Sequence, residues 1–453
     1  MRRSNKHAPK IVTFANLTGG INISQAPEQL ADTDMQVCKN FIYERDSKRL
    51  TGRGGLSAPV YQLPADIRAS WYDVDMNVLF FVTENREIYS LVSGQNTVSI
   101  GSLTGDATPM FAKFQDKVWI ASGALLQYYD YDHLYTVTSS PTCDLVFQRF
   151  ARLAVALTGS DRITFSAVGD GTSWENITDS SQGPPDSSAA WLDVGYGDSG
   201  NILSIIPLST DLLFIKSNGM IYQLTGDALP DTWTVTRLAT DTDPIGKDTA
   251  KSIGQSVIYL SRRGLKTLAT TMDYGNIATT DIGDKFNGLL TNNMWEPQVF
   301  NLRRHSMLMI RPTEDKTYWV AYNYLIGAAT EIDFAFPITS ITETVDEIYV
   351  TSGRAVMKWG NEYLTDNGTP IDYELKPRDV IGTEEMLVKS VDTKFSSDHA
   401  GEAAVSTSKL SVTMPTNTRR KVKCNHSTPC ISLTVKGNDR FTLDHISLEV
   451  ADL

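Results

Sequence analysis

Closely spaced carboxylates are the residues of this sequence that could carry out acid–base chemistry. They form three pairs, Asp130 and Asp132, Asp241 and Asp243, and Asp281 and Asp284. Two carboxyl groups held near each other can cleave a glycosidic bond or bind Ca²⁺. None of the pairs sits in the calcium-loop pattern, and aspartate in loops most often forms turns through its own side chain. The pairs therefore favour turns over catalysis.

The segment Ser166–Trp174 has the ingredients of the Asp-box found in sialidase propellers. Asp170 stands four residues before Trp174, which is closer than that motif requires, and the segment occurs once although such boxes repeat. The sequence also lacks Gly-x-Ser-x-Gly, a P-loop and His-Glu-x-x-His, the motifs that position nucleophiles, phosphates and catalytic zinc. We expect no catalytic residue and predict that the protein is not an enzyme.

The cysteines are too few and too scattered for a disulfide framework: Cys38, Cys143, Cys424 and Cys430. Cys424, His426 and Cys430 place three zinc-ligand types close together. A fourth ligand and a second Cys/His pair at ligand spacing are missing. Ordinary thiols at the start of a strand are therefore favoured over zinc, and we expect no metal and no cofactor.

Basic residues gather at two places that could contact a partner. The stronger cluster contains Arg419, Arg420, Lys421 and Lys423, and a weaker run contains Arg303, Arg304 and His305. The formal net charge of −12 argues against a main surface that grips DNA through its phosphates. For the stronger cluster, contact with acidic neighbouring subunits is favoured and transient phosphate contact stays open. For the weaker run, a solvated strand end is favoured over DNA contact.

Short apolar strands that bend at polar or glycine-containing turns must position these side chains. The clearest hairpin is Asp211–Gly226, in which Asn218-Gly219 tolerates positive φ and suits a tight primed turn. Such turns are expected near Asn85, Gly123, Ser160, Asn218, Arg263, Glu314 and Gly353, which are 37 to 58 residues apart. A repeat of about 40 to 50 residues with several strands in each unit is typical of β-propeller blades.

These turns predict a propeller of about six or seven irregular blades over residues 61–362. Unrelated hairpins in two or three sandwich domains are the alternative. From residue 363 onward, longer strands such as Met386–Phe395 alternate in a way typical of a small antiparallel sandwich. The best helix candidate lies around Thr280–Leu290, and Met35–Tyr43 is expected to form one helical turn and then a strand.

Composition is that of a folded soluble protein, with 41% hydrophobic and 21% charged residues. The N-terminal apolar run is too short for a secretory signal, and no apolar stretch approaches the ~20 residues that span a bilayer. We expect synthesis in a cytoplasm and no membrane insertion.

An ordered set of motifs begins near the N-terminus. The motifs are Gly19-Gly-Ile-Asn22, Ala26-Pro-Glu-Gln-Leu30, Asn40-Phe41, Leu50-Thr-Gly-Arg-Gly-Gly55, Phe165–Trp174, Trp191–Gly195 and Leu212–Gly226. Their order resembles that in tail proteins of short-tailed bacteriophages, the packaged-DNA-stabilisation or tail-nozzle proteins. The likeness covers residues 11–270 and is looser beyond them.

The resemblance implies an all-β fold in which a β-propeller is inserted into a small β-sandwich-like platform formed by residues 1–60 and 363–453. It implies a structural protein of the virion tail, made in the bacterial host cytoplasm, that extends and closes the DNA exit channel, retains the packaged genome and passes DNA at ejection. The expected partners are further copies in a ring, expected as a hexamer, the portal-adaptor ring, other tail proteins including fibres, and double-stranded DNA passing without sequence recognition. The alternative is a carbohydrate-binding or carbohydrate-cleaving receptor-binding propeller, which would show a cleft with convergent carboxylates and aromatic rings.

Overall fold

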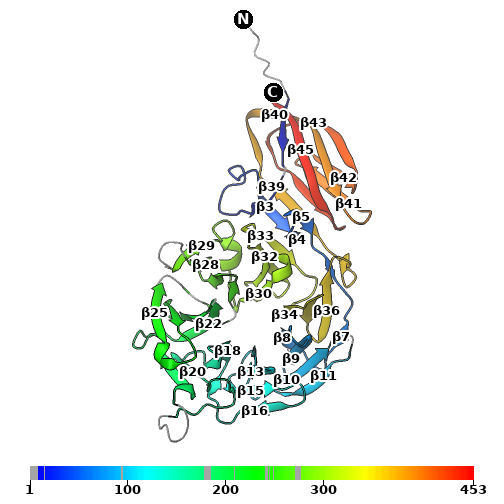
Figure 1. The fold of residues 1–453 in the computed structure, drawn as a ribbon. Coiled ribbons are helices and arrows are strands. Elements are labelled where there is room, and N and C mark those ends of the chain that lie inside the picture. The colour runs from blue at the N-terminus through cyan, green and yellow to red at the C-terminus, as the bar shows by residue number, and fades with distance from the viewer. Residues whose placement is uncertain are drawn as a thin grey trace.

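The computed structural model describes residues 9–14, 16–92, 95–177, 185–208, 210–239, 243, 245–247, 249–270 and 277–452. These residues form two β modules arranged along one long axis (Figure 1). The lower module in that view is a ring of small sheets, and the upper module is a narrow sandwich that contains the C-terminal strand. The predicted all-β fold with a β-propeller is confirmed.

Seven blades surround the centre of the ring. In the first six, four antiparallel strands follow one another outward in chain order, and the first strands of most neighbouring blades contact each other around the centre. Blade 1 contains β8 (Ile67–Asp73), β9 (Val78–Thr83), β10 (Glu87–Val92) and β11 (Val98–Ser102), and blade 2 contains β12 (Met110–Phe114), β13 (Lys117–Ala121), β15 (Gln127–Tyr129) and β16 (Leu134–Thr136). Blade 3 contains β18 (Leu145–Arg149), β19 (Arg152–Ala156), β20 (Arg162–Phe165) and β21 (Ala190–Asp193), and blade 4 contains β22 (Ile202–Leu208), β23 (Asp211–Lys216), β24 (Ile221–Thr225) and β25 (Thr234–Ala239). Blade 5 contains β26 (Ala250–Ile253), β27 (Ser256–Ser261), β28 (Gly264–Thr270) and β29 (Ile277–Asp281), and blade 6 contains β30 (Gln298–Leu302), β31 (Met307–Arg311), β32 (Tyr318–Asn323) and β33 (Ala328–Asp333).

The seventh blade joins strands from both ends of the propeller segment. Its first three strands are β34 (Ser340–Glu343), β35 (Ile348–Ser352) and β36 (Ala355–Gly360). The outer positions beside β36 are taken by β6 (Gly55–Leu56) and β7 (Tyr61–Gln62), which precede the first blade in the chain. This pairing closes the ring, and β6 comes from the segment 1–60 that the sequence assigns to the arm and platform.

The second strand of each blade is its most apolar strand. β9, β19 and β31 are buried over their whole length. Neighbouring blades cover both faces of such a strand, so it does not alternate with polar residues. The described residues accordingly form eight clusters of buried hydrophobic side chains, seven between successive blades and one in the platform.

All seven predicted turns lie between the second and third strands of successive blades. The turn at Asn218-Gly219 differs from the one expected, because Gly219 takes a positive φ of 82° and Asn218 does not. The loop contains three residues, closed by the Lys216 N–H donating to the Met220 carbonyl at 3.0 Å. A three-residue hairpin loop needs one left-handed position, and glycine fills it without strain.

The platform is a sandwich of two sheets built from both ends of the chain. One sheet has the order β4-β5-β45-β40-β43 with β1 beside β45, and the other has the order β3-β39-β44-β41-β42 with β2 beside β3. Their bounds are β1 (Lys10–Thr13), β2 (Gly20–Ile21), β3 (Asp34–Lys39), β4 (Phe41–Tyr43), β5 (Leu50–Gly52), β39 (Tyr373–Pro377), β40 (Val380–Ser396), β41 (Glu402–Thr407), β42 (Leu410–Pro415), β43 (Arg419–Ile431), β44 (Thr434–Gly437) and β45 (Thr442–Asp452). The second sheet continues into blade 6, because β3 pairs with β33.

The remaining elements are short. They are the strands β14 (Ala124–Leu125), β17 (Thr142–Cys143), β37 (Thr365–Asp366) and β38 (Thr369–Pro370), the helix α1 (Asn287–Thr291), and the 3-10 turns η1 (Pro185–Ser187), η2 (Pro230–Thr232) and η3 (Arg303–His305). One local prediction is wrong, and another is right in part. The helical turn expected from Met35 is part of β3, whose backbone pairs with β39. The helix begins at Asn287, because residues 280–281 extend β29 along β28.

Candidate functional site

The propeller encloses a central cavity of about 730 Å³, lined by residues from all seven blades. Its walls are the first strands β8, β12, β18, β22, β26, β30 and β34 and the loops that lead into and out of them. A cavity of roughly 300–1,000 Å³ is the size at which proteins hold small molecules. This cavity has about three times the volume of a second pocket, of about 240 Å³, which lies in the platform and is lined by Phe14, Leu50 and Asp444 among others.

Basic side chains outnumber acidic ones in the cavity lining. Arg68, Lys247, Lys251 and Arg303 line it, with Glu343 as the one acidic residue among the described lining. Lys247 forms an ion pair with Asp144 at 3.5 Å. Within the described residues Arg68, Lys251 and Arg303 have no ion pair. The wall is therefore net positive although the chain as a whole carries a net charge of −12.

Arg68 and Lys247 both donate to backbone carbonyls of the loop that precedes β12. Arg68 donates from Nη1 to the Asp106 carbonyl at 2.9 Å, and Lys247 donates from Nζ to the Thr108 carbonyl at 2.7 Å. Lys251 follows Lys247 by four residues, on β26. The strand starts of blades 1 and 5 thus bring basic groups to one end of the cavity.

Aromatic rings and hydroxyl groups complete the wall. Trp71 and Phe111 stack with ring centroids 5.4 Å apart and an interplanar angle of 7°. The Ser70 hydroxyl lies 2.5 Å from the hydroxyls of both Ser340 and Thr342. The cavity therefore combines apolar ring surface, hydroxyl groups and cations.

Arg303 and Arg304, predicted as contact residues, follow β30 at the edge of this cavity. The Glu343 carboxylate accepts hydrogen bonds from their backbone N–H groups at 2.8 and 3.0 Å and from Arg304 Nε at 3.4 Å. Arg304 also donates to the carbonyls of Val345 and Asp346. The Arg304 side chain therefore binds other residues of the propeller, whereas the Arg303 side chain has no partner in the described part of the chain.

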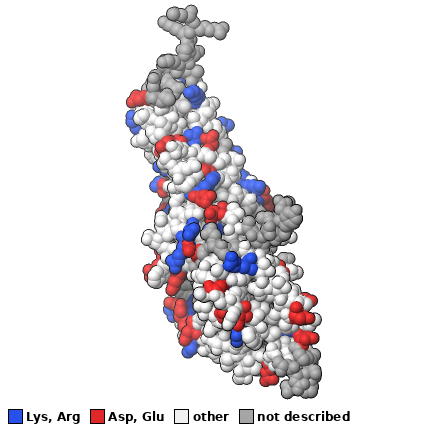
Figure 2. Space-filling view, turned by 90° about the vertical axis from the view of Figure 1, so that its left-hand side faces the viewer, with Lys and Arg blue, Asp and Glu red and all other residues white. Residues whose placement is uncertain are grey.

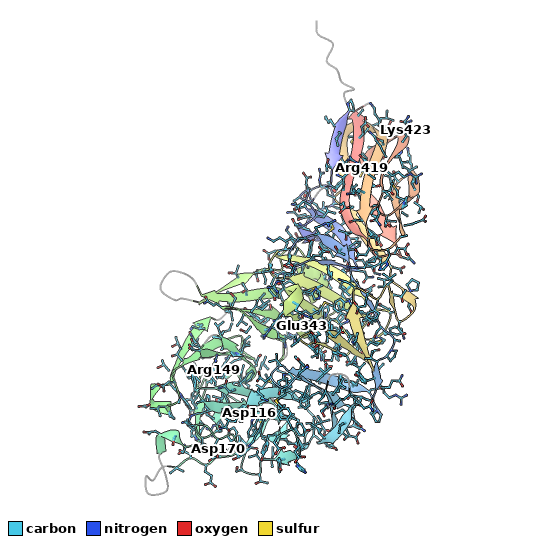
Figure 3. The ribbon with its side chains drawn as sticks, turned by 45° about the vertical axis from the view of Figure 1, so that its right-hand side comes forward. Asp116, Arg149, Asp170, Glu343, Arg419 and Lys423 are labelled. Carbon is cyan, nitrogen blue, oxygen red and sulfur yellow. The ribbon has the colours of Figure 1, made fainter. Side chains whose placement is uncertain are left out.

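The predicted basic cluster lies on β43, the edge strand of a platform sheet, far from Glu343 in the propeller (Figure 3). Arg419 Nη2 pairs with Asp392 at 2.7 Å and Lys421 pairs with Glu449 at 2.7 Å. The hydrogen bond from Arg419 lowers the pKa of Asp392. Arg420 and Lys423 are exposed and without ion-pair partners among the residues described here. The structure therefore separates the two predicted groups into different modules and leaves half of the β43 cluster free.

The carboxylates singled out in the sequence either form local turns or pair with basic side chains. The Asp130 carboxylate accepts from the backbone N–H groups of His133 and Asp132 at 2.8 and 3.0 Å, and these bonds lower the pKa of Asp130. Asp170 likewise accepts from the Thr172 N–H at 2.8 Å. Asp243 pairs with Arg263 and Asp281 with Lys266. None of these carboxylates lines the cavity, and Asp241 lies outside the described residues.

The Cys/His segment offers no metal centre. Cys424 donates weakly to the Val422 carbonyl, and Cys430 lies 3.9 Å from Asp379. Among the described residues, no group of three His, Cys, Asp or Glu side chains could hold a metal ion.

A fully buried arginine at the junction of the two modules was missed by sequence reasoning. Arg53 and Asp366 have side-chain exposures of 0% and 2% and form a two-pronged ion pair at 2.7 and 2.8 Å. The other Arg53 N–H groups donate to Asn40 Oδ1 at 3.0 Å and to the carbonyls of Gly54 and Asp333. All five guanidinium donors are therefore satisfied. A charged residue between apolar strands, within Gly52-Arg53-Gly54-Gly55, was the signal that could have revealed it.

Two more buried cations are Lys216, which lies in a motif that resembles tail proteins, and Arg152, which lies outside these motifs. Lys216 donates to Asp198 at 2.6 Å and to the Val194 carbonyl at 2.5 Å. Burial alone would raise the pKa of Asp198, but hydrogen bonds from Lys216, the Gly200 N–H and Tyr222 lower it to about 2. Arg152 donates to four backbone carbonyls, which belong to Ala228, Ser166, Ser188 and Asp186, and burial lowers its pKa. These side chains hold loops onto blades.

Comparison with known proteins shows similarity of the fold alone. No protein-family model and no curated protein match the chain. Similar solved structures include the WD40 β-propeller domain of Doa1, with a TM-score of 0.44, 11% identity and coverage of 68% of this chain and 97% of that one. BamB from Moraxella catarrhalis has a TM-score of 0.40 and 11% identity, and the match covers 70% of this chain and 92% of that one. The extracellular domain of the putative one-component system BT4673 from B. thetaiotaomicron has a TM-score of 0.49 and 10% identity, and the match covers 89% of this chain and 63% of that one.

No helix in the described part of the chain has the length and apolar character needed to cross a membrane.

Proposed function

We propose that this chain is a structural subunit of the tail nozzle of a short-tailed bacteriophage, assembled as a ring at the DNA exit channel. In this role the platform makes ring contacts and the propeller forms the outer part of the nozzle. The assembled ring retains the packaged genome and lets double-stranded DNA pass at ejection without reading its sequence. The resemblance of the ordered motifs to nozzle proteins is the starting point of this proposal.

The junction between the modules is the observation that carries the proposal. Asn40 and Arg53, which belong to the resembled motifs, are buried there and tie β3, blade 6 and the β37 region together. The sheet that crosses the junction also carries a row of opposite charges, in which Lys39 pairs with Asp333 at 2.6 Å and Lys436 pairs with Glu374 at 3.0 Å. A rigid two-module strut of this kind suits a load-bearing part of an assembly.

The platform offers exposed strand edges for contacts with neighbouring copies. β43 spans 13 residues and, among the strands that the structure describes, pairs only with β40. Edge strands present unpaired backbone groups, and lysine and arginine on them discourage indiscriminate pairing. Arg420 and Lys423 could then select an acidic neighbour, which supports subunit contact rather than DNA contact for this cluster.

The surface charge also fits a passive role. Figure 2 shows acidic and basic side chains interspersed along one face of both modules, without a continuous basic stripe. DNA-gripping proteins need a basic field, because neutralised phosphates supply most of their affinity. The net charge of −12 therefore supports passage of DNA without adhesion.

Carbohydrate cleavage is not favoured by the cavity chemistry. Glycosidases use two carboxyl groups at a separation of roughly 5–10 Å. Glu343 is the one acidic residue in the described lining, and it is hydrogen-bonded to backbone N–H groups.

Native mass measurement of the full chain, alone and mixed with portal-adaptor ring protein, tests the proposal. We expect a ring of several copies, six if the resemblance holds, either alone or on the adaptor. A double reversal, Arg420→Glu with Lys423→Glu, should weaken ring formation. Lys316→Glu, at an exposed lysine between β31 and β32, is the matched control and should leave it intact. A strict monomer in both mixtures would contradict the nozzle assignment.

A further inference from the structure

We propose that the central cavity of the propeller binds a small sugar that carries a carboxylate or a phosphate group. This inference goes beyond the nozzle role, since it concerns the propeller alone and can be tested on the isolated full chain. It follows from the charge, the hydrogen-bonding groups and the ring surfaces of one cavity.

The charge of the wall selects an anion. Lys251 on β26 and Arg303 after β30 have no charged partner, and Arg68 on β8 donates only to the Asp106 carbonyl, in the part of the chain that the structure describes. A surplus of cations in a partly enclosed, low-dielectric cavity repels other cations and attracts anions, because such walls focus the field. Guanidinium groups also match carboxylate and phosphate oxygens in geometry.

The neutral polar groups of the wall select hydroxyl groups. In the described part of the chain, the side-chain oxygens of Gln298 and Asn301 are buried and accept no hydrogen bond, and Arg68 Nε and Nη2 donate none. Buried polar groups without partners are rare, because leaving one unpaired destabilises the folded protein. The terminal torsions of Gln and Asn are soft, so their amide groups can turn toward a hydroxyl donor. A sugar supplies such donors on the same molecule as its anionic group.

The size and ring content of the cavity fit this class of ligand. A volume of about 730 Å³ accommodates one or two sugar rings. Trp71, Phe111 and Phe300 contribute half-buried aromatic surface to the wall. Aromatic side chains offer flat apolar surface to the carbon faces of a ring, while the hydroxyls of Ser70 and Thr342 lie on the same wall.

Isothermal titration calorimetry of the full chain tests the proposal directly. D-glucuronate, D-glucose 6-phosphate and D-glucose are titrated separately at low and at physiological salt. We expect both anionic sugars to bind, glucose to bind at least tenfold more weakly, and raised salt to weaken the anionic sugars. A tenfold difference in Kd corresponds to about 1.4 kcal/mol.

A second set of titrations distinguishes two possible origins of an anionic sugar ligand. A short oligosaccharide that contains uronic acid represents a surface glycan, and glucose 6-phosphate represents a free metabolite. Tighter binding of the oligosaccharide assigns the cavity to glycans, and exclusive binding of the monosaccharide phosphate assigns it to metabolites. Both outcomes support an anionic-sugar site.

Matched substitutions separate the cavity from the general surface. Arg68→Gln and Lys251→Gln should each weaken binding at least tenfold, while Lys251→Arg keeps the charge and should retain binding within about threefold. Arg354→Gln and Lys316→Gln remove the same charges from exposed positions outside the lining and should not change binding. Thermal melts of every variant confirm that the fold is kept. Absence of binding, equal binding of glucose, or equal loss in the control variants would overturn the proposal.

Discussion

The propeller–platform junction and the wall of the central cavity treat buried polar groups in opposite ways. At the junction every N–H of the Arg53 guanidinium has an acceptor, and the Asp366 carboxylate also accepts from the Ala335 N–H at 3.0 Å. In the cavity wall, polar atoms of Arg68, Gln298 and Asn301 are buried without partners among the described residues.

The contrast distinguishes a buried network whose hydrogen bonds are all formed on folding from a cavity wall where some polar groups stay without partners. Satisfied buried networks fix one geometry, because each broken bond would leave a costly orphan group. Unsatisfied polar groups around a cavity lower the stability of the free protein, and a ligand that forms hydrogen bonds with them restores that stability. Stability measurements should therefore show large effects at the junction and small ones at the surface.

Arg53→Met should produce the largest loss of stability. It leaves the Asp366 carboxylate buried without its cation, and breaking such a pair costs about 3–5 kcal/mol. Urea denaturation measures the change in the free energy of unfolding. Arg354→Met, at an exposed arginine of blade 7, is the matched control and should change it by less than about 0.5 kcal/mol. The double variant Arg53→Met/Asp366→Leu should recover part of the loss, and equal stability of Arg53→Met and the control would contradict the network.

Gly55→Ala should weaken the closure of the ring. A Cβ at this position would lie 2.1 Å from the Thr365 carbonyl oxygen, which is backbone and cannot turn aside. We expect a loss of about 1–3 kcal/mol from overpacking, seen as a lower thermal midpoint. Gly246→Ala provides the control, because a Cβ there meets nothing within 4 Å and no positive φ is recorded. Similar midpoints for the two variants would argue against tight packing of β6.

Acid should destabilise the loop that Lys216 holds onto blade 4. The folded pKa of Asp198 is about 2, below its ordinary value of 3.8. A lowered carboxyl pKa stabilises the fold above the ordinary value, and this contribution is lost as pH falls from about 4 to 2. The loss is on the order of 2 kcal/mol. In stability measurements from pH 5 to pH 2, Asp198→Asn should be less stable at pH 5 and should show a shallower decline; parallel curves would rule out this role.

Arg419→Ala should have the smallest effect on the folded chain. The Arg419 side chain is 64% exposed, and ion pairs at such sites contribute little to stability because water screens them. Chemical denaturation should therefore detect little change. A loss as large as that of Arg53→Met would show that the β43 pairs belong to the core of the platform.

The sequence predicted the propeller because hairpin turns depend on local residue chemistry. Apolar runs such as Leu212–Ile215 and turn residues such as Gly219 and Gly353 are visible without any tertiary information. The extended conformation of Met35–Asn40 was not visible, since it depends on pairing with β39, which lies more than 300 residues away in the sequence.

The candidate site could be predicted only in part. Charge runs such as Arg419–Lys423 stand out in a sequence, but half of that run is neutralised by Asp392 and Glu449 on other strands. Arg68 and Lys251 are isolated basic residues in unremarkable strands, and only the circular order of blades brings them to one wall. Residues whose partners are set by distant strand pairing leave no local pattern.

The strand pairings that close both modules have a consequence for synthesis on the ribosome. Gly55 pairs with Gly360, and Lys10 pairs with Val450. At about 5–20 residues per second, β6 waits roughly 15–60 seconds and β1 roughly 20–90 seconds for the final neighbouring strand. During that interval β1 and β6 present open hydrogen-bonding edges in the nascent chain, so the last strands to emerge decide whether a folded subunit or an aggregate is formed.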